Sequence, residues 1–433
     1  MTLASLDLLQ FKNYDEAHLS FARHVNCLTG PNGSGKTNLL DAIHFLALTK
    51  SAFSAQDTLS IRHGTDYAMI RGRFAPDADA APGGLADAAA DVAASLGAAA
   101  TAAPSPTDVV QVNLHAVQKK TVLLNRAPYE RLSEHIGRYP LVLLSPYDTD
   151  LVRKDAEERR RFFDGMLSQR DPAYLDALLR YNGLLRQRNA TLKLFAERRR
   201  ADLELLAVLD EQLAPLGTVL CEARARFLVE FEPLFQRHYA HLTDGAESVA
   251  LLYRSQLAPV AYDGGAADFA TLLAEAQRAD LAAARSTVGP HRDDFDFLLL
   301  PRQIGFDQTP RPVKLLGSQG QQKSFVIALK LAQFELLAAR HRRKPLLLLD
   351  DIFDRLDERR IARLLALVAD GTFGQIFLTD SHPYRAAALL RPLTHDLKEF
   401  RVENGRVGLE KSVVAGRVPG DLPGVETPGN RPL

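Results

Sequence analysis

The sequence predicts an α/β fold with a mixed sheet, interrupted by an inserted and mainly helical arm domain. Strand-like segments alternate with helical patterns near the N-terminus and again from residue 313 to 402. Between these parts, residues 155–239 carry long Leu- and Arg-rich helical patterns with few glycine or proline breaks. We therefore expect the two α/β parts to form one head from which the helical segment projects.

The bulk composition is that of an ordinary folded protein of several domains. The chain has 433 residues, of which 46% are hydrophobic and 24% are charged. Lys+Arg and Asp+Glu both number 53, so the formal net charge is zero. A neutral chain has no overall attraction to nucleic acid or acidic lipid, so any contact with DNA requires a local basic surface.

Cysteines and apolar runs exclude several classes of protein. Only Cys27 and Cys221 occur, without metal-binding spacing, so neither a disulfide scaffold nor a zinc site is expected. The first residues lack the basic and apolar regions of a signal peptide, and no apolar stretch reaches membrane length. We expect a cytoplasmic protein with no membrane partner.

The N-terminal segment is predicted to contain strands at 6–11, 18–21 and 25–29, followed by a helix with apolar residues at helical spacing from Leu39 to Ala47. Residues 76–108 are almost entirely Ala, Gly, Pro, Ser and Asp, which predicts a mobile surface insertion. Strands resume at 109–114 and 121–124. The predicted division is a first head part at 1–150, an arm at 151–285, a second head part at 286–410 and a disordered tail at 411–433.

A glycine-rich turn, Gly30-Pro31-Asn32-Gly33-Ser34-Gly35-Lys36-Thr37, lies between an apolar strand and a helix. It matches the Walker A pattern G-x-x-x-x-G-K-[ST] at every fixed position. Glycines let successive backbone N–H groups face phosphate oxygens, and the helix N-terminus adds a positive dipole. We expect Lys36 to reach the β- and γ-phosphates of ATP and Thr37 to ligate Mg²⁺. A chance glycine-rich turn is the alternative.

A second acidic motif follows the buried-strand pattern Pro345-Leu346-Leu347-Leu348-Leu349, which ends in Asp350 and Asp351. After a Walker A motif, this pattern indicates that Asp350 orients Mg²⁺ and that Asp351 acts as a base toward the attacking water. The alternative is a core strand that ends in two solvated acids.

The segment Ser318-Gln319-Gly320-Gln321-Gln322-Lys323 precedes an apolar helix and resembles the ABC signature. In that family the serine and the helix N-terminus hold the γ-phosphate of the opposite subunit. A helix N-cap with a glycine turn is the alternative, but the position shortly before the acidic strand favours the signature. The three motifs together predict an ABC-type P-loop ATPase head. The expected nucleotide contacts are residues 30–37, Asn38, Ser318, Gly320 and Gln321.

Two weaker elements follow in the same region. Phe353-Asp354-Arg355-Leu356-Asp357 resembles the D-loop, which crosses the dimer interface in ABC proteins. The strand pattern at 376–379 ends where such proteins place a switch residue. His382 lies a little beyond that position, so we interpret it as a surface histidine.

Four further motifs resemble the RecF family of recombination-repair ATPases, and the resemblance covers nearly the whole chain. They are the strand ending Leu8-Leu9-Gln10-Phe11-Lys12-Asn13-Tyr14, Asn38 with the helix that follows it, Ser145-Pro146 together with Arg159-Arg160-Arg161-Phe162-Phe163-Asp164, and Gly289-Pro290-His291-Arg292-Asp293-Asp294. The chain departs from the family pattern at Lys154 and Ala156, where Gly and Pro are usual, and at Asp354-Arg355, where Ser-Glu is usual.

The resemblance implies a weak ATPase that dimerises with ATP on double-stranded and gapped DNA. It implies partnership with RecR, through it with RecO, and indirectly with the RecA recombinase, at the nucleoid. The remaining alternatives are the nucleotide-binding subunit of an ABC transporter and an SMC-type tether. The long insertion before the signature argues against the transporter, and the short arm argues against the tether.

The arm also carries a run of cations that could neutralise DNA phosphates. A solvated helix face is an equal alternative, because cations are favourable near a helix C-terminus. The seven cations are Arg180, Arg186, Arg188, Lys193, Arg198, Arg199 and Arg200, against a single acid, Glu197.

Overall fold

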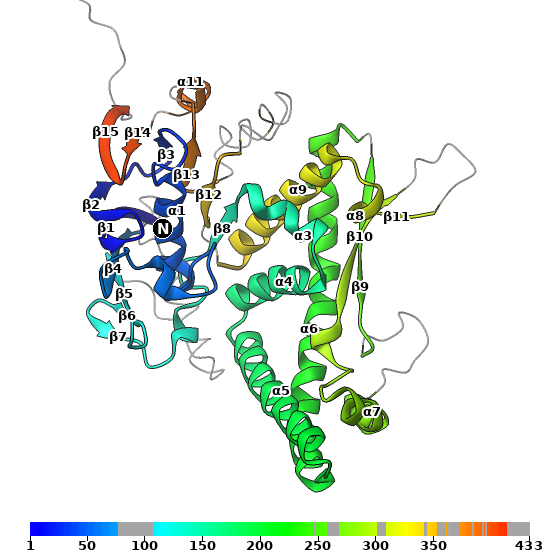
Figure 1. Ribbon diagram of the computed structural model, residues 1–433. Coiled ribbons are helices and arrows are strands. Elements are labelled where there is room, and N and C mark those ends of the chain that lie inside the picture. The colour runs from blue at the N-terminus through cyan, green and yellow to red at the C-terminus, as the bar shows by residue number, and fades with distance from the viewer. Residues whose placement is uncertain are drawn as a thin grey trace, which may run out of the picture.

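Two six-stranded sheets enclose one helix and form the head (Figure 1). The computed structural model describes residues 1–76, 107–245, 247–257, 268–300, 309–341, 344–352, 361, 363, 373–382, 385–391, 394 and 396–413. The first sheet is antiparallel with the order β2-β1-β4-β5-β6-β7. Its strands are β1 (Thr2–Phe11), β2 (Tyr14–Ser20), β4 (Tyr67–Ala75), β5 (Asp108–His115), β6 (Thr121–Leu124) and β7 (Ala127–Pro128).

The second head sheet is mixed, as predicted. Its order is β15-β14-β3-β13-β12-β8, in which only β15 is antiparallel to its neighbour. The strands are β3 (Val25–Thr29), β8 (Leu141–Leu144), β12 (Leu346–Leu349), β13 (Ile376–Asp380), β14 (Leu397–Glu403) and β15 (Arg406–Val413).

The central strands of this sheet are covered on both faces, which explains their uniformly apolar sequences. Leu346 and Leu348 face the core formed with the first sheet and helix α1 (Lys36–Leu48). Leu347 and Leu349 face the opposite core, which is formed with the helices of the arm. The four-leucine run of β12 therefore joins the two cores, and its C-terminal end delivers Asp350 to the edge of the sheet.

The helical insertion is confirmed. Its helices are α3 (Asp150–Arg153), α4 (Ala156–Arg170), α5 (Pro172–Arg198), α6 (Leu203–Thr243) and α7 (Phe269–Ala283). The longest two, α5 and α6, pack as a hairpin that projects from the head (Figure 1). Each begins at an aspartate whose side chain accepts a backbone N–H, Asp171 from Ala173 and Asp202 from Leu205, as is usual for helix N-caps.

The arm also contains a three-stranded antiparallel sheet, of which the sequence predicts only the strand at 296–300 and places it in the second head part. The sheet has the order β11-β10-β9, with β9 (Ser248–Arg254), β10 (Asp294–Leu300) and β11 (Arg311–Pro312). Because β10 pairs with β9 and packs on α4, the arm extends beyond the predicted boundary at residue 285. The chain then continues through α8 (Val313–Leu316) and α9 (Gln319–His341), and α11 (Arg385–Leu390) follows β13.

Other predicted boundaries differ by a few residues. Strand β2 begins at Tyr14 rather than at residue 18, and Lys411–Val413, which we assigned to the tail, belong to β15. Most of the Ala-rich insertion, 77–106, and the rest of the tail, 414–433, lie outside the described residues. Among the helices that the structure describes, none is both long and apolar enough to cross a membrane.

Candidate functional site

The glycine-rich turn connects β3 to α1, as the sequence pattern requires. Its three glycines have positive φ angles of 153° at Gly30, 79° at Gly33 and 117° at Gly35. At Gly35 a Cβ atom would also lie 2.4 Å from the side-chain amide nitrogen of Asn13. A side chain at Gly35 is therefore disfavoured both by the positive φ angle and by this close contact. The turn therefore has the backbone freedom that a phosphate-binding loop needs.

Lys36 lies against this turn. Its Nζ donates to the carbonyl oxygens of Gly30, at 2.7 Å, and Pro31, at 3.0 Å. The side chain is only 6% exposed, so the ammonium is held over the loop rather than extended into solvent. The cation thus lies where an anion bound by the loop would meet it.

Two hydroxyls from different elements meet on the Asp350 carboxylate. Thr37 Oγ1 donates to its two oxygens at 3.0 and 3.1 Å, and Thr379 Oγ1 from the end of β13 donates to Oδ1 at 2.8 Å. Burial raises the pKa of Asp350, and the hydrogen bonds from Thr379 and Thr37 oppose that rise. One carboxylate beside one hydroxyl fits Mg²⁺, which binds hard oxygen donors and usually takes only one or two carboxylates from the protein.

Asp351 follows directly and lines the same pocket as Lys36, Thr37 and Asp350. Its φ angle of 47° is left-handed, which is uncommon for a residue with a side chain. Its backbone N–H donates to Thr379 Oγ1 at 2.8 Å, so Thr379 contacts both aspartates. We did not predict Thr379, although it lies at the end of the strand pattern that we assigned to the switch region.

Asn13, Tyr14 and Asn38 form a hydrogen-bonded group behind the loop, and the sequence did not predict this arrangement. Asn13 Nδ2 donates to the Ser34 carbonyl at 2.9 Å, and Asn38 Nδ2 donates to Asn13 Oδ1 at 2.8 Å. The Tyr14 hydroxyl donates to the Gly35 carbonyl at 2.9 Å. Asn38, which we expected to contact nucleotide, therefore bonds through its amide to the residue that supports the loop.

The β14–β15 turn supports the loop from a third direction. The Gly405 N–H donates to the Ser34 carbonyl at 3.1 Å. Gly405 has a φ of 74°, and a Cβ atom there would lie 2.3 Å from the Asn13 carbonyl oxygen. The sequence signal for this contact is the turn pair Asn404-Gly405 between two strand patterns, but its partner lies far away in the chain.

Ser318 does not meet the loop within one chain. It precedes α9 as a capping residue: Ser318 Oγ accepts the Gln321 N–H at 3.2 Å, and Gln321 Oε1 accepts the Ser318 N–H at 2.7 Å. Ser318 is exposed, and Figure 1 shows the start of α9, beside α8, well apart from α1 and β3. Gly320 lies in the same first turn, and the Gln321 side chain donates to Glu247 at 2.8 Å.

The structure contradicts one of the seven predicted DNA contacts. Arg188 is fully buried, and its guanidinium donates to Asp210 at 2.5 Å, Asp280 at 2.5 Å and Ser286 at 2.9 Å. It is a structural ion pair within the arm, because a buried cation must be matched by acids. The other six cations are exposed: Arg180, Arg186, Lys193, Arg198, Arg199 and Arg200.

The motif at 289–294 belongs to the core of the arm. Arg224 is 2% exposed and donates to Asp164 at 2.9 Å, Asp293 at 2.8 Å and the Pro290 carbonyl at 2.8 Å. Burial lowers the pKa of His291 to about 4, so its ring is neutral. Its Nε2 lies 3.3 Å from the Ser286 carbonyl, which can only accept, so Nδ1 accepts the Tyr181 hydroxyl.

The structure gives little or no support to two of the predicted elements, the D-loop and the switch region. The D-loop segment at 353–357 lies outside the described residues. The His382 side chain is 64% exposed, while Asp380, two residues earlier, is buried and accepts from Arg385 at 2.9 Å. The interpretation of His382 as a surface residue agrees with this exposure.

Comparisons with known proteins agree on one family. The family described as "RecF/RecN/SMC N terminal domain" matches residues 2–385. The DNA replication and repair protein RecF of Cytophaga hutchinsonii is 38% identical over 407 residues, covering 94% of this chain and 96% of that protein. The protein of the same name from Flavobacterium johnsoniae is 39% identical and covers 93% of this chain and 100% of that protein.

Solved structures share the fold. A structure described as the recombination mediator protein RecF with ATP, in the RecFOR pathway, superposes with a TM-score of 0.78 at 24% identity, covering 95% of this chain and 98% of that one. The Smc head domain of Pyrococcus furiosus, solved with an extended coiled coil, superposes with a TM-score of 0.53 at 16% identity, covering 95% and 96%.

Proposed function

This chain belongs to the RecF family of DNA replication and repair proteins, and we propose that it is an ATPase whose two copies close on ATP while bound to DNA. The feature that carries the proposal is the separation of two half-sites. The Walker A loop and its acidic partners form one half, and Ser318 caps a helix that begins elsewhere. A Ser318 hydroxyl can meet a phosphate on this loop only if a second copy supplies it.

The chemistry of one half-site follows from its own residues. The backbone N–H groups of the loop and the N-terminus of α1 bind phosphate oxygens, and Lys36 adds a cation. Thr37 and Asp350 would hold Mg²⁺, which would neutralise charge on the β- and γ-phosphate oxygens. Asp351, fixed through its backbone to Thr379, accepts a hydrogen bond from water and orients it toward the terminal phosphate.

The wider role is a proposal that the family membership supports. We propose that the closed dimer binds gapped DNA and, with RecR and through it RecO, helps to load RecA, and that slow ATP hydrolysis releases the DNA. In support, the relatives are named DNA replication and repair proteins, and a protein of the same fold is described as a recombination mediator of the RecFOR pathway. The six exposed arm cations are proposed DNA contacts, at the nucleoid in the cytoplasm.

The transporter alternative loses its support. The family match covers residues 2–385, on both sides of the arm, and the curated relatives match along 93–94% of the chain. A transporter subunit would share only the motifs of the head.

Sedimentation velocity with and without ATP tests the shared site. Asp351→Asn should bind ATP and accumulate as a dimer, because the water-orienting carboxylate is removed while the phosphate contacts remain. Ser318→Arg should stay monomeric and still bind nucleotide. Ser412→Arg, at an exposed position of β15, is the matched control and should dimerise normally.

Two outcomes would count against the shared site. An Asp351→Asn chain that stays monomeric while saturated with ATP would exclude it. Dimerisation of Ser318→Arg at wild-type ATP concentrations would also exclude it.

A further inference from the structure

Two glutamine side chains hold the peptide group that precedes the exposed Ser318. Gln321 Oε1 accepts the Ser318 N–H at 2.7 Å, and Gln322 Nε2 donates to the Gly317 carbonyl oxygen at 3.0 Å. This carbonyl and this N–H belong to one peptide unit, which is planar. Because both of its polar groups are bonded, the plane of the unit is fixed, and with it the direction in which Ser318 leaves the backbone.

Each glutamine can do this in only one orientation of its amide. The amide carries an oxygen that accepts and an NH₂ group that donates, and a half-turn about the last side-chain bond exchanges them. Gln321 must present its oxygen to the Ser318 N–H, and Gln322 must present its nitrogen to the Gly317 carbonyl. The opposite orientations would place two donors or two acceptors against each other.

Glu247 selects the orientation of Gln321. An ionised carboxylate can only accept, and Glu247 Oε1 accepts from Gln321 Nε2 at 2.8 Å. Glu247 Oε2 accepts from the Tyr239 hydroxyl at 2.6 Å. Tyr239 is fully buried in α6, and its ring centroid lies 6.1 Å from that of Phe325 in α9. The carboxylate is therefore held by a fixed hydroxyl, and the Gln321 oxygen is turned toward Ser318.

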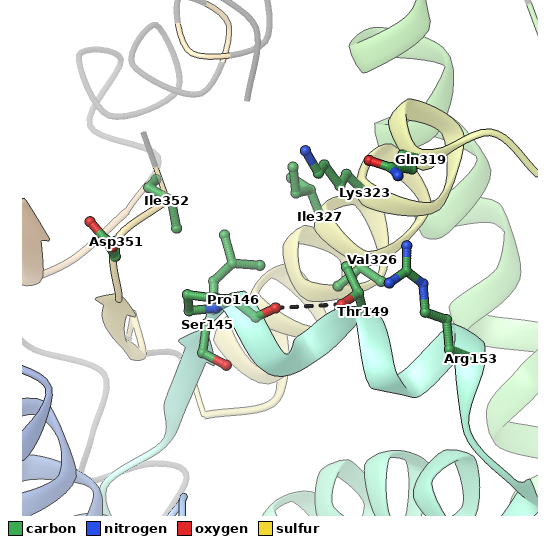
Figure 2. Close-up of a pocket in the computed structure, with 11 residues that line it drawn as sticks. Ser145, Pro146, Thr149, Arg153, Gln319, Lys323, Val326, Ile327, Asp351 and Ile352 are labelled. Carbon is green, nitrogen blue, oxygen red and sulfur yellow. Dashed lines mark hydrogen bonds between the residues drawn. The ribbon is translucent and has the colours of Figure 1, made fainter. Parts of the chain in front are cut away.

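Arg153 selects the orientation of Gln322 by the opposite chemistry. A guanidinium can only donate, and Arg153 Nε donates to Gln322 Oε1 at 2.8 Å, which leaves the Gln322 nitrogen for Gly317. Arg153 extends from α3 toward the first turns of α9 (Figure 2). Gln322 is 7% exposed, so water has little access to its amide. Glu247 and Arg153 both belong to the arm, and their opposite charges match the opposite ends of the two amides.

We propose that Glu247 and Arg153 are positioning residues of the shared nucleotide site. They orient the two glutamines, and the glutamines fix the peptide unit that directs Ser318 toward the phosphate of the second copy. This role rests on the proposed function, in which Ser318 meets that phosphate. It adds two arm residues that act through the start of α9 and not on the nucleotide itself.

Sedimentation velocity at saturating ATP tests the role of Glu247. Glu247→Ala should lower the dimerisation constant about tenfold or more, because each dimer contains the lost hydrogen bond twice. Glu247→Gln should retain most of the wild-type constant, since its oxygen can accept from Gln321 while its nitrogen donates to the Tyr239 oxygen. Isothermal titration calorimetry should give both variants the wild-type affinity of the monomer for ATP, because the Walker A loop is unchanged.

Arg153 has a corresponding pair of variants. Arg153→Lys keeps a donor for Gln322 and should dimerise like the wild type. Arg153→Glu offers an acceptor, which favours the reversed amide of Gln322, and should weaken dimerisation as Glu247→Ala does.

Glu335→Ala is the matched control. Glu335 lies about four turns further along α9 and accepts from Arg237 and His238 of α6. Its replacement removes a carboxylate that joins the same two helices, and dimerisation should be unchanged.

A double variant separates positioning from general support of the fold. When Ser318→Ala is already present, Glu247→Ala should lower the dimerisation constant by no more than about twofold further, because two residues that act through one contact are not additive. A fully additive effect would overturn the inference. Glu247→Gln as weak as Glu247→Ala would also overturn it, because the orientation of the amide would then not matter.

Hydrogen exchange of the nucleotide-free chain tests the positioning without dimerisation. Residues 318–322 should lose protection in Glu247→Ala and keep it in Glu247→Gln and Glu335→Ala. Equal exchange in the wild type and Glu247→Ala would overturn the inference whether or not the chain dimerises. A wild-type chain that stays monomeric at saturating ATP would refute the proposed function, and Glu247 and Arg153 would then support only the start of α9.

Discussion

At the scale of single residues, Asn13 shows how side chains behind a binding loop prepare it. A loop that turns its N–H groups toward a ligand directs carbonyl oxygens to the other side, where they need donors. The Ser34 carbonyl receives two donors, Asn13 Nδ2 and the Gly405 N–H, and the Gly35 carbonyl receives the Tyr14 hydroxyl. These bonds hold the loop in its binding conformation before the ligand arrives.

Asn13→Ala should therefore weaken ATP binding, although Asn13 itself lies behind the loop. The variant removes the hydrogen bond to Ser34 and leaves the Asn38 amide without its acceptor, at about 1 kcal/mol each, which corresponds to a drop in affinity of about tenfold or more. Isothermal titration calorimetry with ATP measures the change.

Asn113→Ala is the matched control for this variant. Asn113 accepts from Tyr67 and Gln111 on the outer face of the first sheet, so its replacement removes a similar set of bonds away from the loop. Equal weakening of ATP binding in both variants would mean that the effect is a general decrease in stability.

The sequence predicts this part of the site unevenly. Lys36, Thr37, Asp350 and Asp351 are brought together as expected, because each lies at a fixed offset from a strand or helix pattern. The supports Thr379 and Gly405 lie at the ends of recognisable strand patterns, but the sequence does not indicate which residues they contact. Their contacts depend on how β13 and β14 lie beside β3, and strand order is a tertiary property.

At the scale of elements, the arm hairpin depends on a buried cation. Arg188 of α5 pairs with Asp210 of α6 and with Asp280 of α7, so one side chain joins three helices. The helical period indicates its burial. Residues four or seven positions apart lie on the same face of a helix. Tyr181 lies seven positions before Arg188, Leu192 four after it and Phe195 seven after it, and all three are buried. The charge of Arg188 does not distinguish it from the exposed cations of the run, whereas the helical period does.

Arg188→Ala should destabilise the arm strongly. It leaves the buried Asp280 and the partly buried Asp210 without their cation, and loss of one partner of a buried ion pair typically lowers the free energy of unfolding by about 3–5 kcal/mol. Chemical denaturation followed by far-UV circular dichroism measures the decrease.

The control is Arg186→Ala on the exposed face of the same helix, with an expected change of about 0.5 kcal/mol or less. If Arg188→Ala keeps full stability but no longer binds DNA, the structural assignment of Arg188 is wrong and its prediction as a DNA contact is restored.

The arm sheet marks the limit of prediction at this scale. Residues 248–254 alternate in burial as a half-buried strand should, but they follow a helix of 41 residues and their partner β10 begins only at Asp294. Long helical patterns are strong local signals, whereas an isolated strand pattern needs its partner for stability. The sequence therefore predicts the helices well, and of the sheet it predicts only part of β10.

At the scale of the whole molecule, the net charge is zero, so any attraction to DNA depends on where the charged residues lie. Lys+Arg and Asp+Glu are equal in number, so the chain as a whole is not drawn to DNA. When the buried Arg188 is excluded from the seven predicted DNA contacts, six exposed cations remain. Three of them, Arg198 to Arg200, are consecutive at the tip of the hairpin. In the proposed dimer a second copy doubles this set, which would link the proposed ATP-driven dimerisation to affinity for DNA.

The affinity for gapped DNA, measured across a salt series with and without ATP, should test whether dimerisation increases DNA binding. The logarithm of affinity should fall more steeply with salt when ATP is present, because two arms then release counterions. Arg198→Ala/Arg199→Ala/Arg200→Ala should reduce the slope by about 0.9 for each phosphate that is no longer neutralised. Lys119→Ala/Arg131→Ala/Lys411→Ala removes the same charge from exposed positions of the head and should leave the slope unchanged. If only the head variant flattens the slope, DNA lies on the head and the arm cations are a solvated helix face.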